Sequence, residues 1–401
     1  MRNERRIQVP WSGRGQAYTD EEIAVVVQAM KDADPLTQGR HQTAFEERFA
    51  RLIGLPRAFA VSSCTAALEL SAVLLDLGPE DEVVMPAHTF AATAIPFART
   101  GARIKWADID PDTRVVTAGT LAAVTTERTK VFVVVHLYGL VCDMDPILDL
   151  ARSRGIKVVE DAAQCLGATY KGRQAGSMGD FACFSFHSHK NVSTLGEGGM
   201  LTVRDEALAA LVPGLRHNGV RPFPGDRKRY WQPAMSNVDF DIEGLWPYNF
   251  CIGEVQCALG FKLLERLDVI NRERAERGRR FIDAFSGYPE LSFQKITDGC
   301  EHSYHLLAAR YDGSRFGATR DELIELLAFS YGVKTVVQYC PLYRYPLFRK
   351  AGFGVANCPN TDHFFDNMIS FPFQHWMSDL EFSTMIDATR EALDHLRRRP
   401  S

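Results

Sequence analysis

The feature of this sequence that most restricts its fold is a regular alternation of short β-branched runs with helical stretches. Six apolar runs predict strands, namely RAFAV, EVVMP, RIKWADI, VFVVVH, IKVVED and FACFSF. Helical stretches of about ten residues separate most of them, which indicates crossover units and a mainly parallel sheet. Runs such as VFVVV, apolar on both faces, are typical of strands covered on both sides. The sequence therefore predicts an α/β fold built on a large sheet.

The alternation fades after residue 205, and a helical pattern near residues 250–280 leads into a different region. A chain of 401 residues has room for two domains of about 100–200 residues each. We expect a large α/β domain with an N-terminal arm over 1–260 and a small C-terminal α+β domain over 261–401. One helix is expected to begin after Thr19, where Glu22 completes a capping box.

Composition excludes several classes of protein. A net charge of −4 gives no indication of nucleic acid or an anionic membrane surface as a partner. No apolar run approaches the roughly 18 residues of a membrane span, and the N-terminal stretch lacks the apolar core of a secretory signal. Nine cysteines without a CxxC pair predict reduced, mostly buried thiols, as in a cytoplasmic protein.

Polar residues follow several predicted strands, at the sheet edge where open α/β proteins bind ligands. Asp161 ends IKVVED, and Lys190 follows FACFSF. The junction AVSSCTAALEL carries small residues at a helix start, where free N–H groups bind anions. Each feature has a simpler explanation, because Asp161 could cap the next helix and the serines could be ordinary N-caps.

The stretch FSFHSHKNVSTLGEGG (184–199) admits three hypotheses: a metal site, a phosphate-binding loop or a nucleophilic lysine. His187 and His189 make only two ligands, and no further ligand lies at metal spacing, so no metal is expected. A phosphate loop of the GxxxxGK[ST] type has its lysine after the glycines, whereas Lys190 precedes them. We expect the glycines to allow a tight backbone turn beside Lys190.

These pieces fit one chemistry, that of pyridoxal phosphate. The cofactor needs a lysine for a Schiff base, an anion cradle, a carboxylate that keeps its ring nitrogen protonated, and an aromatic face. Lys190 offers the amine, Asp161 the carboxylate, the helix start at 63–67 the cradle, and Phe90 the face.

The motifs in this order resemble the DegT/DnrJ/EryC1/StrS family of sugar aminotransferases. They include AVSSCTAALEL, VVMPAHTFAATA, VVVHLYG, VVEDAAQCLGATY, FSFHSHKNVSTLGEGGM, WPYNFCIGEVQCALG, HSYHLL and VQYCPLYRYPLF, and they cover nearly the whole chain. The resemblance implies the fold-type I architecture of aspartate aminotransferase: a large mixed, mainly parallel sheet domain and a small C-terminal domain. It also implies a homodimer with shared active sites, and transfer of an amino group, usually from glutamate, to a nucleotide-linked keto-sugar.

The resemblance also assigns residues. Lys190 resembles the Schiff-base lysine, which also moves the proton, and Asp161 resembles the partner of the ring nitrogen. Gln164 resembles the group near the ring hydroxyl, Phe90 the stacking ring, and Asn249 the asparagine that reaches the phosphate from the other subunit. The residues that resemble the phosphate cradle are Cys64, Thr65, Ala66 and Ser185.

Two departures leave the substrate open. Where the family often has a histidine pair in a segment like HYxPLH, this chain has QYCPLY with Gln338 and Tyr343. Segment 216–247 is too long for a plain connection. Its basic residues fit either a diphosphate or a solvated loop; they are Arg216, Arg221, Arg227, Lys228 and Arg229.

The alternatives are the same chemistry on a keto-cyclitol or an unlinked keto-sugar, or a sugar dehydratase of the same family. The dehydratase branch has histidine in place of the lysine; counting from FSF places Lys190, not His189, at that position. A non-catalytic binding or regulatory role would predict loss of Lys190 or Asp161, and both are present. The sugar, the nucleotide, the aminated carbon and the stereochemistry are not predicted.

Overall fold

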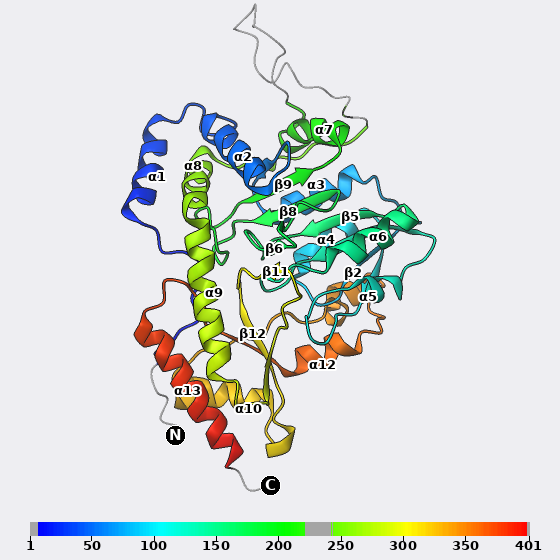
Figure 1. The fold of residues 1–401 in the computed structure, drawn as a ribbon. Helices are drawn as coiled ribbons and strands as arrows, with labels where there is room; N and C mark the ends of the chain where they lie inside the picture. The colour runs from blue at the N-terminus through cyan, green and yellow to red at the C-terminus, as the bar shows by residue number, and fades with distance from the viewer. Residues whose placement is uncertain (1–6, 221–241, 243, 399–401) are drawn as a thin grey trace, which may run out of the picture.

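The computed structural model describes residues 7–220, 242 and 244–398, and a seven-stranded sheet forms its centre (Figure 1). The strands are β1 (Phe59–Val61), β2 (Glu82–Pro86), β3 (Arg103–Ala107), β4 (Thr129–Val135), β5 (Lys157–Asp161), β8 (Phe181–Ser185) and β9 (Gly199–Val203). Their order is β1-β9-β8-β5-β4-β2-β3. Strands β3, β2, β4, β5 and β8 are parallel, whereas β9 is antiparallel to both β8 and β1. The predicted mixed, mainly parallel sheet is confirmed.

The sheet is buried on both faces, as the doubly apolar runs predict. In β4, Val131 and Val133 pack in one hydrophobic cluster, whereas Phe132 and Val134 pack in another on the opposite face. The first face is covered by α3 (Cys64–Leu74), α4 (Ile95–Arg99) and α7 (Glu206–Arg216). The second is covered by α2 (Arg40–Ile53), α5 (Ala118–Ala122), α6 (Met144–Arg154) and α8 (Glu254–Leu263).

A second core lies around a smaller antiparallel sheet, in the order β10-β12-β13. Its strands are β10 (Leu291–Phe293), β12 (Leu307–Tyr311) and β13 (Met368–Phe371). The helices that pack in this core are α9 (Leu267–Ala284), α10 (Arg320–Glu325) and α13 (Asp379–Arg397). Two further helices, α11 (Pro346–Lys350) and α12 (Pro359–Asn367), pack in the clusters of the large sheet through Phe348 and Phe364. A third sheet joins β11 (Cys300–Glu301) to β6 (Thr169–Tyr170) and β7 (Arg173–Gln174), so the two parts of the chain are in contact. The domain boundary at residue 260 stays a prediction.

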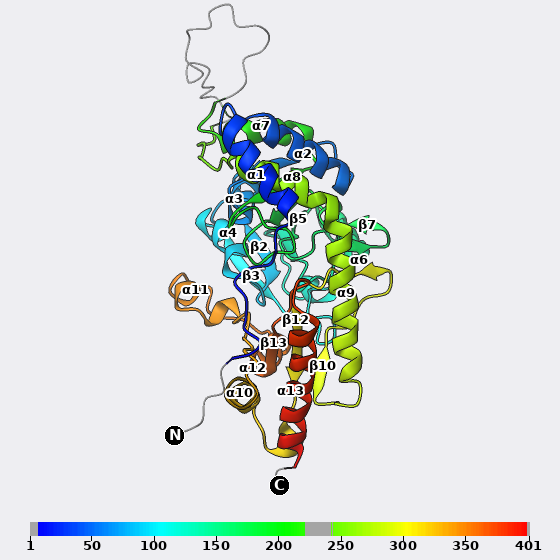
Figure 2. The same cartoon turned by 90° about the vertical axis from the view of Figure 1, so that its left-hand side faces the viewer.

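The N-terminal arm, residues 7–19, connects the second core to the loop before Lys190 (Figure 2). Val9 forms a bridge with Val333 and packs in the second core. Further along, the Gly15 N–H donates to the Ser188 carbonyl at 2.6 Å. The arm ends at α1 (Asp20–Asp32), where Thr19 and Glu22 form the predicted capping box.

The structure corrects one hypothesis about segment 216–247. Arg216 ends α7, is 4% exposed, ion-pairs with Glu46 and donates to the Ala60 carbonyl at 2.7 Å. It is therefore not available to a diphosphate. The other basic residues of that segment lie outside the described residues; they are Arg221, Arg227, Lys228 and Arg229. None of the helices in the described part of the chain combines the length and apolar character needed to cross a membrane.

Candidate active site

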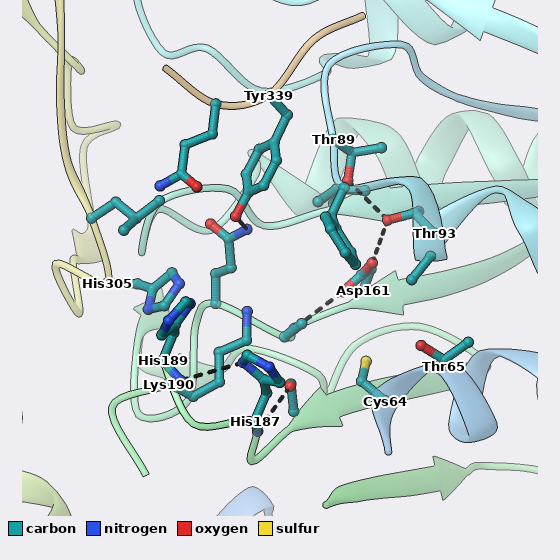
Figure 3. A pocket seen from close by; sticks show the side chains of 18 of the residues that line it. Cys64, Thr65, Thr89, Thr93, Asp161, His187, His189, Lys190, His305 and Tyr339 are labelled. Carbon is teal, nitrogen blue, oxygen red and sulfur yellow. Dashed lines mark hydrogen bonds between the residues drawn. The ribbon is translucent and has the colours of Figure 1, made fainter. Parts of the chain in front are cut away.

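A cavity of about 450 Å³ lies where the carboxyl ends of β4, β5 and β8 meet the C-terminal part of the chain (Figure 3). Strand ends contribute Val135, Asp161 and Ser185, and the start of α3 contributes residues 63–65. The opposite wall comes from distant segments of the chain, which place Trp11, Ser12, His305, Leu306, Gln338, Tyr339, Phe373 and Gln374 around it. The sheet edge predicted from the sequence thus forms one side of this pocket.

Lys190 points into this cavity from a tightly folded loop after β8. The loop is closed by N–H···O bonds from Ser188 to Gly196, from Phe186 to Gly198 and from Thr194 to Phe186. Gly196 has φ of +121°, which glycine adopts readily, so the predicted glycine turn beside the lysine is present. A Cβ on Gly15 would lie 2.2 Å from the Lys190 carbonyl oxygen, so the arm packs directly on the lysine backbone.

The electrostatic setting of Lys190 favours a reactive amine. Burial lowers the pKa of its ammonium group, and the nearby Cys64 and Asp161 oppose that change. No hydrogen bond to its Nζ is made by any residue in the described ranges. A lysine whose pKa is lowered has more of its amine neutral, which is the form that attacks a carbonyl.

Asp161 ends β5 with its carboxylate fixed inside the cavity. Thr93 Oγ1 donates to Oδ2 at 2.7 Å, and the Ala163 N–H donates to Oδ1 at 3.1 Å. Thr93 is held in turn by Thr89 at 2.8 Å. Burial raises the pKa of the Asp161 carboxyl group, and these hydrogen bonds oppose the rise. A protonated ring nitrogen beside it would favour the ionised carboxylate.

The start of α3 forms an anion cradle. Ser63 is the N-cap and its hydroxyl accepts the Ala66 N–H at 3.1 Å. Within the described chain, the N–H groups of Cys64 and Thr65 make no hydrogen bond, and both residues line the cavity. Ser185, 9% exposed, lines it from β8. Ala66 does not line the cavity, and its N–H donates to the Ser63 hydroxyl. Its predicted place in the cradle stays a prediction.

Gly199 shows how closely the cradle is built. It pairs with Val61 of β1 and Ser185 of β8, directly behind the start of α3. A Cβ at this position would lie 2.4–2.6 Å from backbone atoms of Ser63 and Cys64. Only glycine lets β9 approach the helix start this closely, so the cradle depends on the absence of a side chain here.

The expected ring contacts also converge on the cavity. Phe90, 58% exposed, lines it and packs edge-on against Tyr339 with ring centroids 5.9 Å apart. Gln164 Oε1 accepts the Tyr138 N–H at 2.8 Å, and its Nε2 donates to the Tyr339 hydroxyl at 3.3 Å. Tyr339 was not predicted as a site residue, although it lies in the QYCPLY motif. In that motif Gln338 lines the cavity, whereas Tyr343 is buried elsewhere and donates to Asp362 at 2.6 Å.

The histidines have a place but no assigned role. His187 and His189 both line the cavity, with ring centroids 5.1 Å apart. His305, which the sequence did not single out, also lines the cavity, next to His189 (Figure 3). Burial lowers the pKa of both His189 and His305. Among the described residues, no group of three His, Cys, Asp or Glu side chains is placed to hold a metal ion.

Asn249 lies outside the cavity. It is exposed and forms an antiparallel bridge with His217. Its predicted role in a second copy of the chain stays a prediction.

These residues fit pyridoxal phosphate, because one cavity holds free N–H donors, a fixed carboxylate, an aromatic face and a buried amine. When bound, the cofactor supplies a charged ring that withdraws electrons from a substrate carbon.

Comparison with known proteins agrees with this site. The model of the DegT/DnrJ/EryC1/StrS aminotransferase family matches residues 17–390. The spore coat polysaccharide biosynthesis protein SpsC of Bacillus subtilis is 37% identical over 373 residues, covering 92% of this chain and 94% of that protein. GDP-perosamine synthase of Caulobacter vibrioides is 42% identical over 316 residues, covering 77% and 78%.

Solved structures give the same result. Spr1654 of Streptococcus pneumoniae, in its PMP form, matches with a TM-score of 0.85 at 29% identity, covering 97% of this chain and all of that one. The same protein is also solved in a PLP form. The expected fold and cofactor are confirmed. The chain belongs to the DegT/DnrJ/EryC1/StrS aminotransferase family and is a pyridoxal-phosphate-dependent sugar aminotransferase.

Proposed function

We propose that this enzyme transfers an amino group from glutamate to the keto carbon of a nucleotide-linked deoxysugar. The observation that carries the proposal is the single cavity in which Lys190 and Asp161 face polar side chains of the opposite wall. Ser12, Gln338 and Gln374 offer a hydroxyl and two amides there, which suit the hydroxyl groups of a sugar ring. The name of the Caulobacter relative, GDP-perosamine synthase, supports a nucleotide-linked substrate.

Each residue has a distinct task in this proposal. The N–H groups of Cys64 and Thr65, with Ser185, hold the phosphate, and Phe90 covers one face of the ring. Asp161 keeps a proton on the ring nitrogen, because its carboxylate is fixed by Thr93 and Ala163. The Lys190 amine would hold the cofactor through its carbonyl carbon and, once free, would carry a proton to and from the substrate carbon.

The test of the substrate is a half-reaction. The purified holoenzyme is first treated with glutamate and freed of excess donor, and candidate ketones are then added while the cofactor absorbance is followed. Nucleotide-linked keto-sugars are expected to restore the starting spectrum, and the matching free keto-sugars and keto-cyclitols are expected to fail at equal concentration. Equal rates with the unlinked ketones would refute the nucleotide requirement. Formation of a deoxygenated sugar without amino transfer would indicate the dehydratase alternative.

We further propose a homodimer in which Asn249 completes the site of the other subunit. Its exposed position outside the cavity of its own chain supports this. Lys190→Ala and Asn249→Ala variants are inactive separately in this proposal. After mixing and subunit exchange, half of the dimers are hybrids, and each hybrid contains one intact site. Activity should therefore recover to about a quarter of wild type, as twofold symmetry requires. No recovery of activity, with subunit exchange shown by mass spectrometry, would contradict shared sites.

We also propose a cytoplasmic location, which the free cysteines support.

A further inference from the structure

A second cavity, of about 310 Å³, lies between the loop after β3 and the C-terminal part of the chain, near β10, β12 and α12. Figure 1 shows where β12 and α12 lie. Three cationic side chains line it, Arg114, Lys295 and Arg310, against one carboxylate, Asp112. Within the described ranges, none of these three cations forms an ion pair with a carboxylate. The cavity therefore has an excess of positive charge.

Arg114 is the unusual member of this set. It is 5% exposed, its Nε has no hydrogen-bond partner, and its Nη2 reaches only Ser292 Oγ, at 3.4 Å. Its guanidinium lies over the Phe364 ring, 4.8 Å from the centroid. Burial, followed by the charge of Arg310, lowers the pKa of Arg114 to about 10. The charges of Asp112 and Asp110 oppose this change only in part. A buried guanidinium without an ion pair to a carboxylate is unfavourable, so the site is built to receive negative charge from elsewhere.

The walls of the cavity are held together. Asp110 Oδ1 accepts the N–H groups of Asp112 and Thr113, which fixes the loop that carries Arg114. Gln294 Nε2 donates to the Thr113 carbonyl at 2.6 Å, and the Lys295 N–H donates to the Asp112 carbonyl at 3.0 Å. The two sides of the cavity are thus tied to each other.

Arg310 is also fixed in place. Its Nη1 lies 2.7 Å from His363 Nε2, and its Nε lies 3.3 Å from Ser292 Oγ. The nearby N-terminus of α12 is already capped, because Asp108 accepts the N–H groups of Asn360 and Thr361. The attraction for an anion therefore comes from side chains and not from free helix N–H groups.

We propose that this cavity binds a phosphate dianion, either free or as the phosphoryl group of a small metabolite. Two guanidinium groups and an ammonium group from different elements can share the charge and the oxygens of a dianion, which suits phosphate better than a single carboxylate. The apolar faces of Phe293 and Phe364 line the rest of the volume. They offer a surface for an attached organic group.

The phosphate site is separate from the active site, and packed side chains lie between the two cavities. Phe364 packs edge-on against His88, with centroids 5.2 Å apart, and His88 Nε2 lies 2.7 Å from the Tyr138 hydroxyl. The Tyr138 hydroxyl donates to the carbonyl of Gln338, which lines the active-site cavity. Among the residues that the structure describes, none lines both cavities.

The test is isothermal titration of the holoenzyme with inorganic phosphate, and in a second arm with glycerol 3-phosphate, at constant ionic strength. Arg310→Gln and Arg114→Gln each remove one charge from the cavity. Arg51→Gln removes one from the exposed surface of α2, where Arg51 is paired only loosely with Glu47, at 3.9 Å. Thermal unfolding in chloride checks that each variant is folded. Arg310 is partly exposed, so Arg310→Gln is a more conservative change than Arg114→Gln.

We expect the dissociation constant of one phosphate equivalent to rise at least tenfold in Arg310→Gln and in folded Arg114→Gln, and to stay unchanged in Arg51→Gln. Tighter binding of glycerol 3-phosphate than of phosphate assigns the site to an ester; the reverse assigns it to the free ion. Phosphate that binds the cofactor cradle or the substrate site responds to none of these changes. Binding that is equal in Arg310→Gln and wild type, or absent in wild type up to about 10 mM, which is already weak, would overturn the proposal.

Discussion

Replacing Gly199 with alanine tests whether the start of α3 is the phosphate cradle. Gly199 lies between Val61 and Ser185 in the sheet, and a Cβ there would stand 2.4 Å from the Ser63 carbonyl carbon and 2.6 Å from the Cys64 nitrogen. Both are backbone atoms, which cannot rotate away as a side chain could. The added methyl group therefore has to push the helix start away from β9.

The size of the effect follows from these contacts. Carbon atoms pack at about 3.5–4.0 Å, so relief of the clash requires a shift on the order of 1 Å. Charge-assisted hydrogen bonds to phosphate have lengths of about 2.7–2.9 Å and do not survive such a shift. Loss of two of them, at about 1.5 kcal/mol or more each, weakens cofactor binding by about 3 kcal/mol, roughly a hundredfold. Overpacking alone also lowers the stability of the apoprotein by about 1–3 kcal/mol.

The assay is a titration of apoprotein with pyridoxal phosphate, followed by absorbance, with thermal unfolding of both apoproteins alongside. Gly287→Ala is the matched control, because a Cβ at Gly287 meets nothing within 4 Å. It should bind the cofactor as wild type does. If Gly199→Ala is folded and binds the cofactor with the affinity of the control, the cradle does not lie at Ser63–Thr65 and the argument fails.

Three further outcomes are expected. Lys190→Ala should lower the rate of the half-reaction with glutamate at least about 10⁴-fold, since it removes both the nucleophile and the proton carrier. The control Lys157→Ala, which removes an exposed lysine paired with Asp180, should leave that rate unchanged. Near-equal rates for the two variants would contradict the assignment of Lys190. Asp161→Asn should make the apoprotein more stable than wild type at neutral pH, because burial raises the pKa of this carboxyl group in the folded state. The wild-type apoprotein becomes less stable as pH rises from about 4 through the raised pKa, because the buried carboxyl group must then ionise. The stability difference between Asp161→Asn and wild type, measured by thermal unfolding, should therefore be smallest at low pH and should increase with pH. A difference that shrinks with rising pH would refute the predicted direction of the pKa change. Phe90→Ala should weaken cofactor binding about tenfold, as the ring makes an exposed stacking face, and an unchanged dissociation constant would exclude stacking.

The parts of the site that were predicted from the sequence are those fixed by local pattern. Asp161 and Lys190 follow buried strands, so the sheet itself brings them to one edge. Tyr339 and His305 join them only because the second core packs over that edge, and no local pattern carries that information. Trp11, in the N-terminal arm, reaches the cavity by the same kind of long-range contact.

One local prediction failed for an identifiable physical reason. Arg216 was grouped with a basic segment by composition, but α7 buries it against Glu46. Residue spacing along the sequence does not reveal such a nearby partner. The predicted place of Ala66 in the cradle stays a prediction, and its N–H donates to the N-cap Ser63.

The arm also sets an order of events during synthesis on the ribosome. Val333, the partner of Val9, is translated more than 300 residues after it. At translation rates of about 5–20 residues per second, the arm waits on the order of tens of seconds for that partner. Gly15 packs on the backbone of Lys190, so the arm is anchored late over a lysine loop that is made much earlier. The active site of the nascent enzyme is therefore incomplete until the segment around Val333 has been translated.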